Sequence, residues 1–168
     1  MKQEEKEKAM TISIRDKLAT LGLELPAPTS PAANYISVVR TGNLLFISGQ
    51  ISKAPDGEII AGTLGADISH EQGVQAALIA ALNLLGLIAA KTDGSLSSVR
   101  RIVKLGVFVT ATSEFKDQSK IANGASDLMV AVFGEAGQHT RAAIGVSSLP
   151  SGAAVEIDAV VELEETRC

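Results

Sequence analysis

The sequence predicts an α+β domain in which one β-sheet carries helices on a single face. Two observations lead to this fold class. Strand-like and helix-like segments follow one another without the regular strand–helix repeat of a doubly wound fold. The last strand-like segment, residues 153–163, alternates apolar and mostly acidic side chains, as expected for a sheet with one open face. With 168 residues, 46% of them hydrophobic, the chain is long enough to form a core as a single domain.

The N-terminal segment is expected to be a charged, flexible leader over residues 1–12, followed by a single domain over residues 13–165. The stretch MKQEEKEKAM lacks the apolar core of a signal peptide, so a cytoplasmic location is expected. A short amphipathic helix follows, with Ile14, Leu18 and Leu21 on one side.

The next elements are a loop, a hairpin and a long helix. Three prolines in residues 26–34 predict a loop. Apolar runs on both sides of the RTGN stretch at residues 40–43 predict a β-hairpin, and Pro55-Asp56-Gly57 predicts a second turn. Ser69 and Gln72 form a capping-box pattern that opens the long helix.

The apolar stretch at residues 73–90 is long enough to raise the question of a membrane span. Gln75 and Asn83 interrupt it, and alanines are frequent within it. A buried helix is therefore predicted, with Val74, Leu78, Leu82, Leu85 and Ile88/Ala89 as its inward stripe and an end near Gly94.

The second half of the chain predicts a strand, a helix and two more strands. Val103, Leu105, Val107 and Val109 are expected on one face of the first of these strands. A helix is predicted from about residue 117 to 133, with Leu128, Met129 and Val132 inward and Gly134 at its end.

The composition argues against several classes of protein. The net charge of −4 and the lack of a dense basic patch argue against a nucleic-acid partner. One cysteine, Cys168, and two separated histidines give no recognisable metal site, and no phosphate-binding glycine motif or nucleophile elbow is present. We therefore expect no metal and no membrane partner.

Two charged residues lie within strand-like apolar runs, Arg141 and Glu156. A guanidinium can grip a carboxylate through two hydrogen bonds, and a nearby carboxylate can hold a water and transfer its proton. The alternative is structural, because an arginine and a glutamate on neighbouring strands can simply pair with each other. The row of Glu156, Asp158 and Glu162 is also typical of a solvated sheet face.

Several separated blocks resemble the RidA/YjgF family of reactive imine and enamine deaminases. They are Tyr35 with TGNLLFISGQI, the strand VKLGVFVT and the closing TRAAIGVSSLPSGAAVEIDAVVE, and they span residues 32–163. The resemblance is to a longer-loop branch, because extra sequence precedes Tyr35 and Ala143 stands where the compact members often have cysteine.

The resemblance implies a chorismate-mutase-like fold, a mixed sheet backed by two helices on one face, and a homotrimer with a central barrel. It implies that Arg141 binds a substrate carboxylate and that Glu156 positions or activates water, as the catalytic residues. Tyr35, Ser48 and Gly49 would line the substrate-binding cleft between subunits, and no cofactor would be required.

The function expected from this resemblance is hydrolysis of small 2-imino or 2-enamino acids to 2-keto acids and ammonia. An alternative is a non-catalytic module that binds a small carboxylate or docks a partner enzyme. Ribonuclease activity, also attributed to some members of the family, is disfavoured by the acidic composition.

Overall fold

The computed structural model describes residues 12–28, 30 and 33–165. Apart from Ile12, the predicted flexible leader over residues 1–12 lies outside the described residues. The helices and strands, in chain order, are α1 (Ile14–Thr20), β1 (Val38–Thr41), β2 (Leu44–Ile51), α2 (His70–Lys91), η2 (Leu96–Ser98), β3 (Val99–Thr110), α3 (Gln118–Phe133), η3 (Gly134–Gly137), β4 (Thr140–Val146), η4 (Pro150–Gly152) and β5 (Val155–Leu163).

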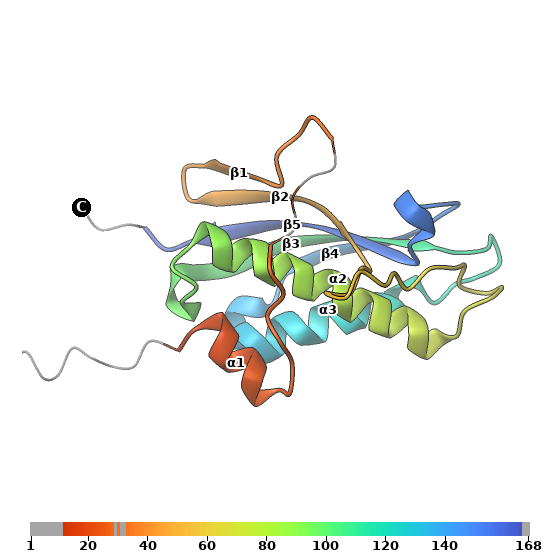
Figure 1. Ribbon diagram of the computed structural model, residues 1–168, viewed down its shortest axis with the longest axis horizontal. Coiled ribbons are helices and arrows are strands. Elements are labelled where there is room, and N and C mark those ends of the chain that lie inside the picture. Colours follow the sequence, from red (N-terminus) through yellow and green to blue (C-terminus); the bar gives the residue numbers. More distant parts are fainter. Residues whose placement is uncertain (1–11, 29, 31–32, 166–168) are drawn as a thin grey trace, which may run out of the picture.

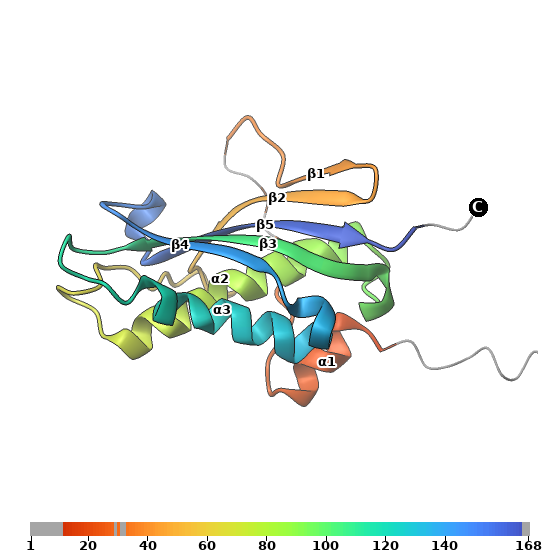
Figure 2. The same cartoon turned by 180° about the vertical axis from the view of Figure 1, so that it is seen from behind.

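The strands form one mixed sheet in the order β1-β2-β5-β3-β4. Neighbouring strands are antiparallel except β3 and β4, which are parallel and are connected through α3. The three helices α1, α2 and α3 all lie on one side of this sheet, as Figure 1 and the reverse view in Figure 2 show. The predicted α+β class is therefore confirmed, with a third helix, α1, added to the two that the family resemblance implied.

The core lies between the sheet and the helices. On β5, Val155, Ile157, Ala159 and Val161 are buried, whereas the residues between them are only half-buried. This alternation is the predicted one, because successive side chains of a strand point to opposite faces.

The predicted inward stripe of α2 is confirmed at Leu85 and Ile88, which are fully buried, but not in the first half of the helix. Val74, Leu78 and Leu82 are only partly buried. The alanines Ala76, Ala77, Ala80 and Ala81 are fully enclosed instead. Small side chains let this part of α2 approach its neighbours closely.

Helix α2 is long and apolar enough to cross a membrane, but 61% of its apolar window is buried within the fold. It begins with the predicted capping box between Ser69 and Gln72. These observations confirm the prediction of a buried core helix.

The predicted face of β3 is wrong at one position. Leu105, Val107 and Val109 are buried, but Val103 is half-buried and Ile102 takes its place in the core. The register between β3 and β5 shifts between Ile102 and Lys104. Such an irregularity reverses the side-chain alternation, which a simple period of two does not anticipate. In α1, Leu21 is likewise exposed because the helix ends before it.

None of the helices α1, α2 and α3 covers the other face of the sheet (Figures 1 and 2). Exposed apolar side chains lie on it, including Val39, Phe46 and Ile144. The register places Phe46 beside Val160 and Ile144 beside Phe108, so these residues share the face of Glu156. The site described next lies on this uncovered face.

Candidate functional site

The site is built around an irregularity in β2. Between Ile47 and Gln50 the register with β5 shifts, so Ser48 and Gly49 form a bulge. The side chain of Glu156 on β5 lies directly over Gly49, and a Cβ atom at Gly49 would overlap the Glu156 carboxyl group. Any larger residue at position 49 would force the Glu156 carboxyl group out of its present place. β-Bulges often direct side chains at functional sites in this way.

Gly49 and Glu156 line a pocket of about 300 Å³, within the range of small-molecule sites. Tyr35, from the loop before β1, lines the same pocket, with the nearly buried Gln50 and Asn83 and with Pro150 from η4. Three of the predicted site residues, Tyr35, Gly49 and Glu156, are thus brought together from three separate segments.

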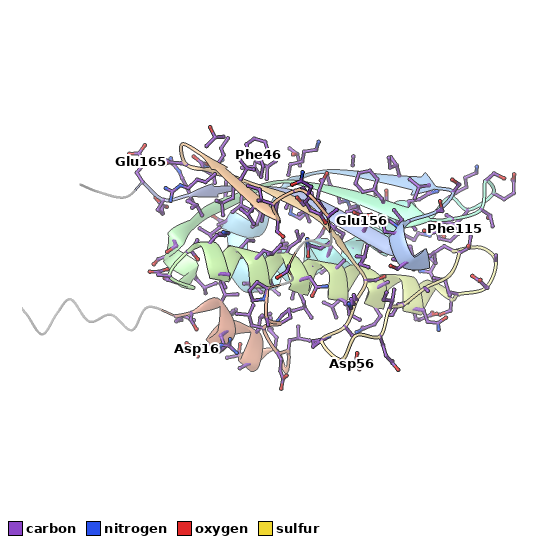
Figure 3. All side chains as sticks on the ribbon, turned by 45° about the horizontal axis from the view of Figure 1, so that its top comes forward. Asp16, Phe46, Asp56, Phe115, Glu156 and Glu165 are labelled. Atoms are coloured by element: carbon purple, nitrogen blue, oxygen red, sulfur yellow. The ribbon has the colours of Figure 1, made fainter. Side chains whose placement is uncertain are left out.

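Burial raises the pKa of Glu156 above its ordinary value, and the negative charge of Asp158 raises it further. Asp158 lies two residues along the same strand and face, where its carboxylate accepts a hydrogen bond from the backbone N–H of Gly106 at 3.1 Å. Figure 3 shows Glu156 on the sheet, away from the helical layer. A carboxyl group with a raised pKa is suited to exchange protons with a bound ligand or water.

Ser48 lies in the bulge but points its hydroxyl elsewhere. Its Oγ donates to the backbone carbonyl of Ile36 at 3.1 Å, and Ser48 is not among the residues that line the Glu156 pocket. In the isolated chain, Ser48 thus connects β2 to the segment that carries Tyr35.

Arg141 lies on the opposite face of the sheet from Glu156. Arg141 is aligned with Leu105, which faces the helices, whereas Glu156 is aligned with Phe108. Strand β3 also separates β4 from β5. The structural alternative of a direct Arg141–Glu156 pair on neighbouring strands is therefore wrong within one copy of the chain.

The guanidinium of Arg141 is oriented by uncharged acceptors on α3. It donates to Asn123 Oδ1 at 2.9 Å, to Ser126 Oγ at 3.0 Å and to the Ser119 carbonyl at 3.3 Å. The Arg141 side chain forms no ion pair with any described residue. Its positive charge is thus held in place without being neutralised, on an edge strand.

The sequence did not reveal the role of His139, which forms a hydrogen bond with Ser126. His139 Nδ1 lies 2.6 Å from the Gly137 carbonyl, which can only accept, so Nδ1 carries the proton. In the neutral ring Nε2 then accepts from Ser126 Oγ at 2.9 Å, which leaves the lone pairs of Ser126 for Arg141. The available signal was the position of His139 directly before the strand that carries Arg141.

Metal ligands are not clustered in the described part of the chain, where no group of three or more histidine, cysteine, aspartate or glutamate side chains could hold an ion. Within one copy of the chain, the pocket joins the half-buried Glu156 carboxyl group to the Tyr35 rim, and Arg141 is not part of it. The fold and site thus define an α+β protein whose sheet carries a pocket within the size range of small-molecule sites.

Comparison with known proteins identifies the family to which this chain belongs. Residues 26–163 match the family model described as Endoribonuclease L-PSP. The chain therefore belongs to that family, which is also called the YjgF/RidA family.

Relatives span nearly the whole chain. Protein TCP17 of Trypanosoma cruzi is 48% identical over 147 residues, which cover 87% of this chain and 91% of that protein. The solved structure of Atu1372 from Agrobacterium tumefaciens, described as of unknown function, has 40% identity and a TM-score of 0.84, with 94% of this chain and 97% of that one covered. E. coli TdcF with bound serine has 25% identity and a TM-score of 0.60, with 82% and 94% covered.

Proposed function

We propose that this chain hydrolyses small 2-imino and 2-enamino acids to 2-keto acids and ammonia, without a cofactor. The observation that carries the proposal is the Glu156 carboxyl group, which is seated on Gly49 in a pocket of about 300 Å³ and has a raised pKa. Membership of the YjgF/RidA family supports it, as does the small amino acid bound by the related TdcF.

The proposed reaction needs few groups. The oxygen of a water molecule adds to C2 of the imine, and the electron pair of the C=N bond moves to nitrogen, which takes up a proton. Glu156 accepts one proton from the attacking water and passes it to this nitrogen, which gives a carbinolamine with a hydroxyl and an amino group on C2. Glu156 then accepts the hydroxyl proton and passes it to the amino nitrogen, so that the C–N bond breaks, ammonia leaves and a C2 carbonyl remains. A carboxyl group with a raised pKa is available in both protonation states nearer to neutral pH.

The substrate carboxylate requires a cation, and Arg141 is the candidate. Because Arg141 and Glu156 lie on opposite faces of the sheet in one copy, we place Arg141 of one copy beside the Glu156 pocket of another. Two features support this placement. Arg141 is on the edge strand β4, and its charge is not neutralised. A cyclic homotrimer, as in related family members, would repeat this shared site at each of its subunit interfaces.

Two inactive variants test the shared site when they are combined. Arg141→Ala and Glu156→Gln, each alone, should lower imine hydrolysis by about 10²-fold or more, measured as release of keto acid from an imine generated in the assay. Co-expression with two different affinity tags yields mixed trimers. In every mixed cyclic trimer one of the three interfaces carries both native residues, so about a third of wild-type activity should return.

Other outcomes have distinct meanings. No recovery in the mixed trimers would show that both residues act from one copy. Full activity of Arg141→Ala would overturn the role of the arginine. If wild type hydrolyses no imine, yet a 2-keto acid raises its melting temperature through Arg141, the chain is a carboxylate-binding module instead.

A further inference from the structure

Asn83 is a polar residue in the otherwise apolar middle of α2, and its side chain is 94% buried, as its relative exposure of 6% shows. Its Nδ2 donates to the Lys53 carbonyl at 2.9 Å and to the Ile51 carbonyl at 3.2 Å. Both acceptors are backbone oxygens, so the amide nitrogen must face the end of β2. This determines the orientation of the amide group, and the oxygen points away from these two carbonyls.

The amide oxygen of Asn83 has no hydrogen-bond donor among the described residues. No buried side-chain nitrogen or oxygen in the described part of the chain is both sealed from solvent and unpaired. Oδ1 must therefore reach accessible surface. Asn83 lines the pocket that contains Glu156, so its oxygen opens into that pocket.

Ile51, Ile59 and Pro150 contribute apolar side chains to the wall of this pocket. An acceptor in such surroundings is left unsatisfied when a ligand displaces its water without offering a donor. A bound ligand is therefore favoured when it brings an N–H or O–H group to Oδ1, and disfavoured when it brings another acceptor.

We propose that Asn83 is a specificity-determining residue, whose amide oxygen accepts a hydrogen bond from the nitrogen on C2 of the ligand. The proposal rests on the proposed function and deepens it. An imine or amine nitrogen at C2 can donate to Asn83. A ketone oxygen in the same place cannot, and it would face the amide oxygen directly. Hydrolysis would thus replace a matched group by a mismatched one, which favours release of the keto acid.

A pair of ligands with the same carbon skeleton tests this selectivity. We choose L-2-aminobutyrate and 2-oxobutyrate, because both offer a carboxylate to Arg141 and differ only at C2. Isothermal titration calorimetry of the full chain should show about tenfold tighter binding of the amino acid. In Asn83→Leu the ratio of the two dissociation constants should fall towards one. The ratio is a suitable readout because misfolded protein alters the stoichiometry and not the dissociation constants.

Asn83→Asp is the matched control. Both substitutions remove the Nδ2 donors to Ile51 and Lys53, but aspartate keeps an acceptor in the pocket, so it should retain the preference for the amino acid. Ser52→Ala is the second control. Ser52 is fully buried in the same segment and donates to the Ile60 carbonyl at 2.8 Å, so its loss loosens the segment without altering the pocket acceptor.

An unchanged ratio in Asn83→Leu would overturn the role of Asn83 while leaving the proposed function intact. An equal fall in Asn83→Asp or Ser52→Ala would also overturn it, because the effect would then come from the loosened strand end. If wild type binds neither ligand, the proposed site itself fails. Should Asn83→Leu not fold, Asn83→Ala removes the same oxygen and is measured in its place.

Discussion

Glu156 differs from the other carboxyl groups whose pKa the fold shifts. The pKa values of Glu71, Asp93 and Asp117 are lowered, mainly by hydrogen bonds to their carboxylates. That of Glu156 is raised, first by burial and then by the charge of Asp158. The folded chain therefore binds the Glu156 proton more tightly than the unfolded chain does, and ionised Glu156 lowers stability.

Glu156→Gln is expected to be more stable than wild type at neutral pH. In wild type, the stabilisation from the bound proton is complete below the ordinary pKa of 4.5 and is lost as pH rises through the raised value. Glutamine does not ionise, so the advantage of the variant should grow from about pH 4 upwards and then level off. Urea unfolding across this range measures the difference in free energy.

Glu162→Gln provides the comparison on the same strand and face. The Glu162 carboxylate lies 3.2 Å from Arg101 Nε and 3.7 Å from Arg100 Nη1, so its charge is already compensated. This variant should gain no stability at neutral pH. An advantage of Glu156→Gln that does not change with pH would contradict the explanation from ionisation.

At the scale of elements, the contact between α2 and α3 depends on a missing side chain. A Cβ atom at Gly124 of α3 would overlap the backbone carbonyl oxygen of Val74 of α2 and would lie 3.1 Å from the Val74 carbonyl carbon. Backbone cannot move aside as a side-chain end can. The two helices therefore lie as close together as they do because residue 124 is glycine.

Gly124→Ala should lower the free energy of unfolding by about 1–3 kcal/mol, because it overpacks this contact. At an unobstructed helix position the same change would stabilise by about 0.5–1 kcal/mol, so the sign of the effect is diagnostic. Thermal unfolding measures this change in stability, as a shift of the melting temperature by about 2–4 °C for each kcal/mol. Asp127→Ala, on an exposed part of the same helix, should stay within about 0.5 kcal/mol of wild type. A Gly124→Ala variant as stable as wild type would contradict the close contact.

At the scale of the whole molecule, the sheet has one covered face and one uncovered face. The uncovered face carries the exposed side chains of Val39, Phe46 and Ile144 together with the Glu156 site. Figure 3 shows Phe46 standing on this side of the sheet. An apolar sheet face without a helix over it is suited to association, which agrees with the proposed trimer and its shared site.

Phe46→Glu is expected to shift the chain towards monomers, because it introduces a charge beside Val160 and Val39. Light scattering at low protein concentration measures the mass. Val130→Glu is the matched control, since Val130 is similarly exposed but lies on α3 in the helical layer, and it should keep the wild-type mass. A wild type that is monomeric under these conditions would contradict both the association and the shared site.

The sequence by itself determined the elements and most of the residues that face the core. Local patterns predict features that depend on neighbours within a few residues. Examples are the capping at Ser69, the turn at Gly42 and the alternation along β5. Glu156 was identified as a charge within an apolar strand and Gly49 through the family resemblance, and the structure places the Glu156 side chain over Gly49.

Only the tertiary structure decided which elements lie side by side and which faces their side chains share. The insertion of β3 between β5 and β4 separates Arg141 from Glu156, and bulges in β2 and β3 change which side chains face the core. Strand order and register arise from packing between segments distant in the chain, which no local period records. For the same reason the amide of Asn83, an apparent interruption in an apolar helix, becomes part of the pocket only in the folded molecule.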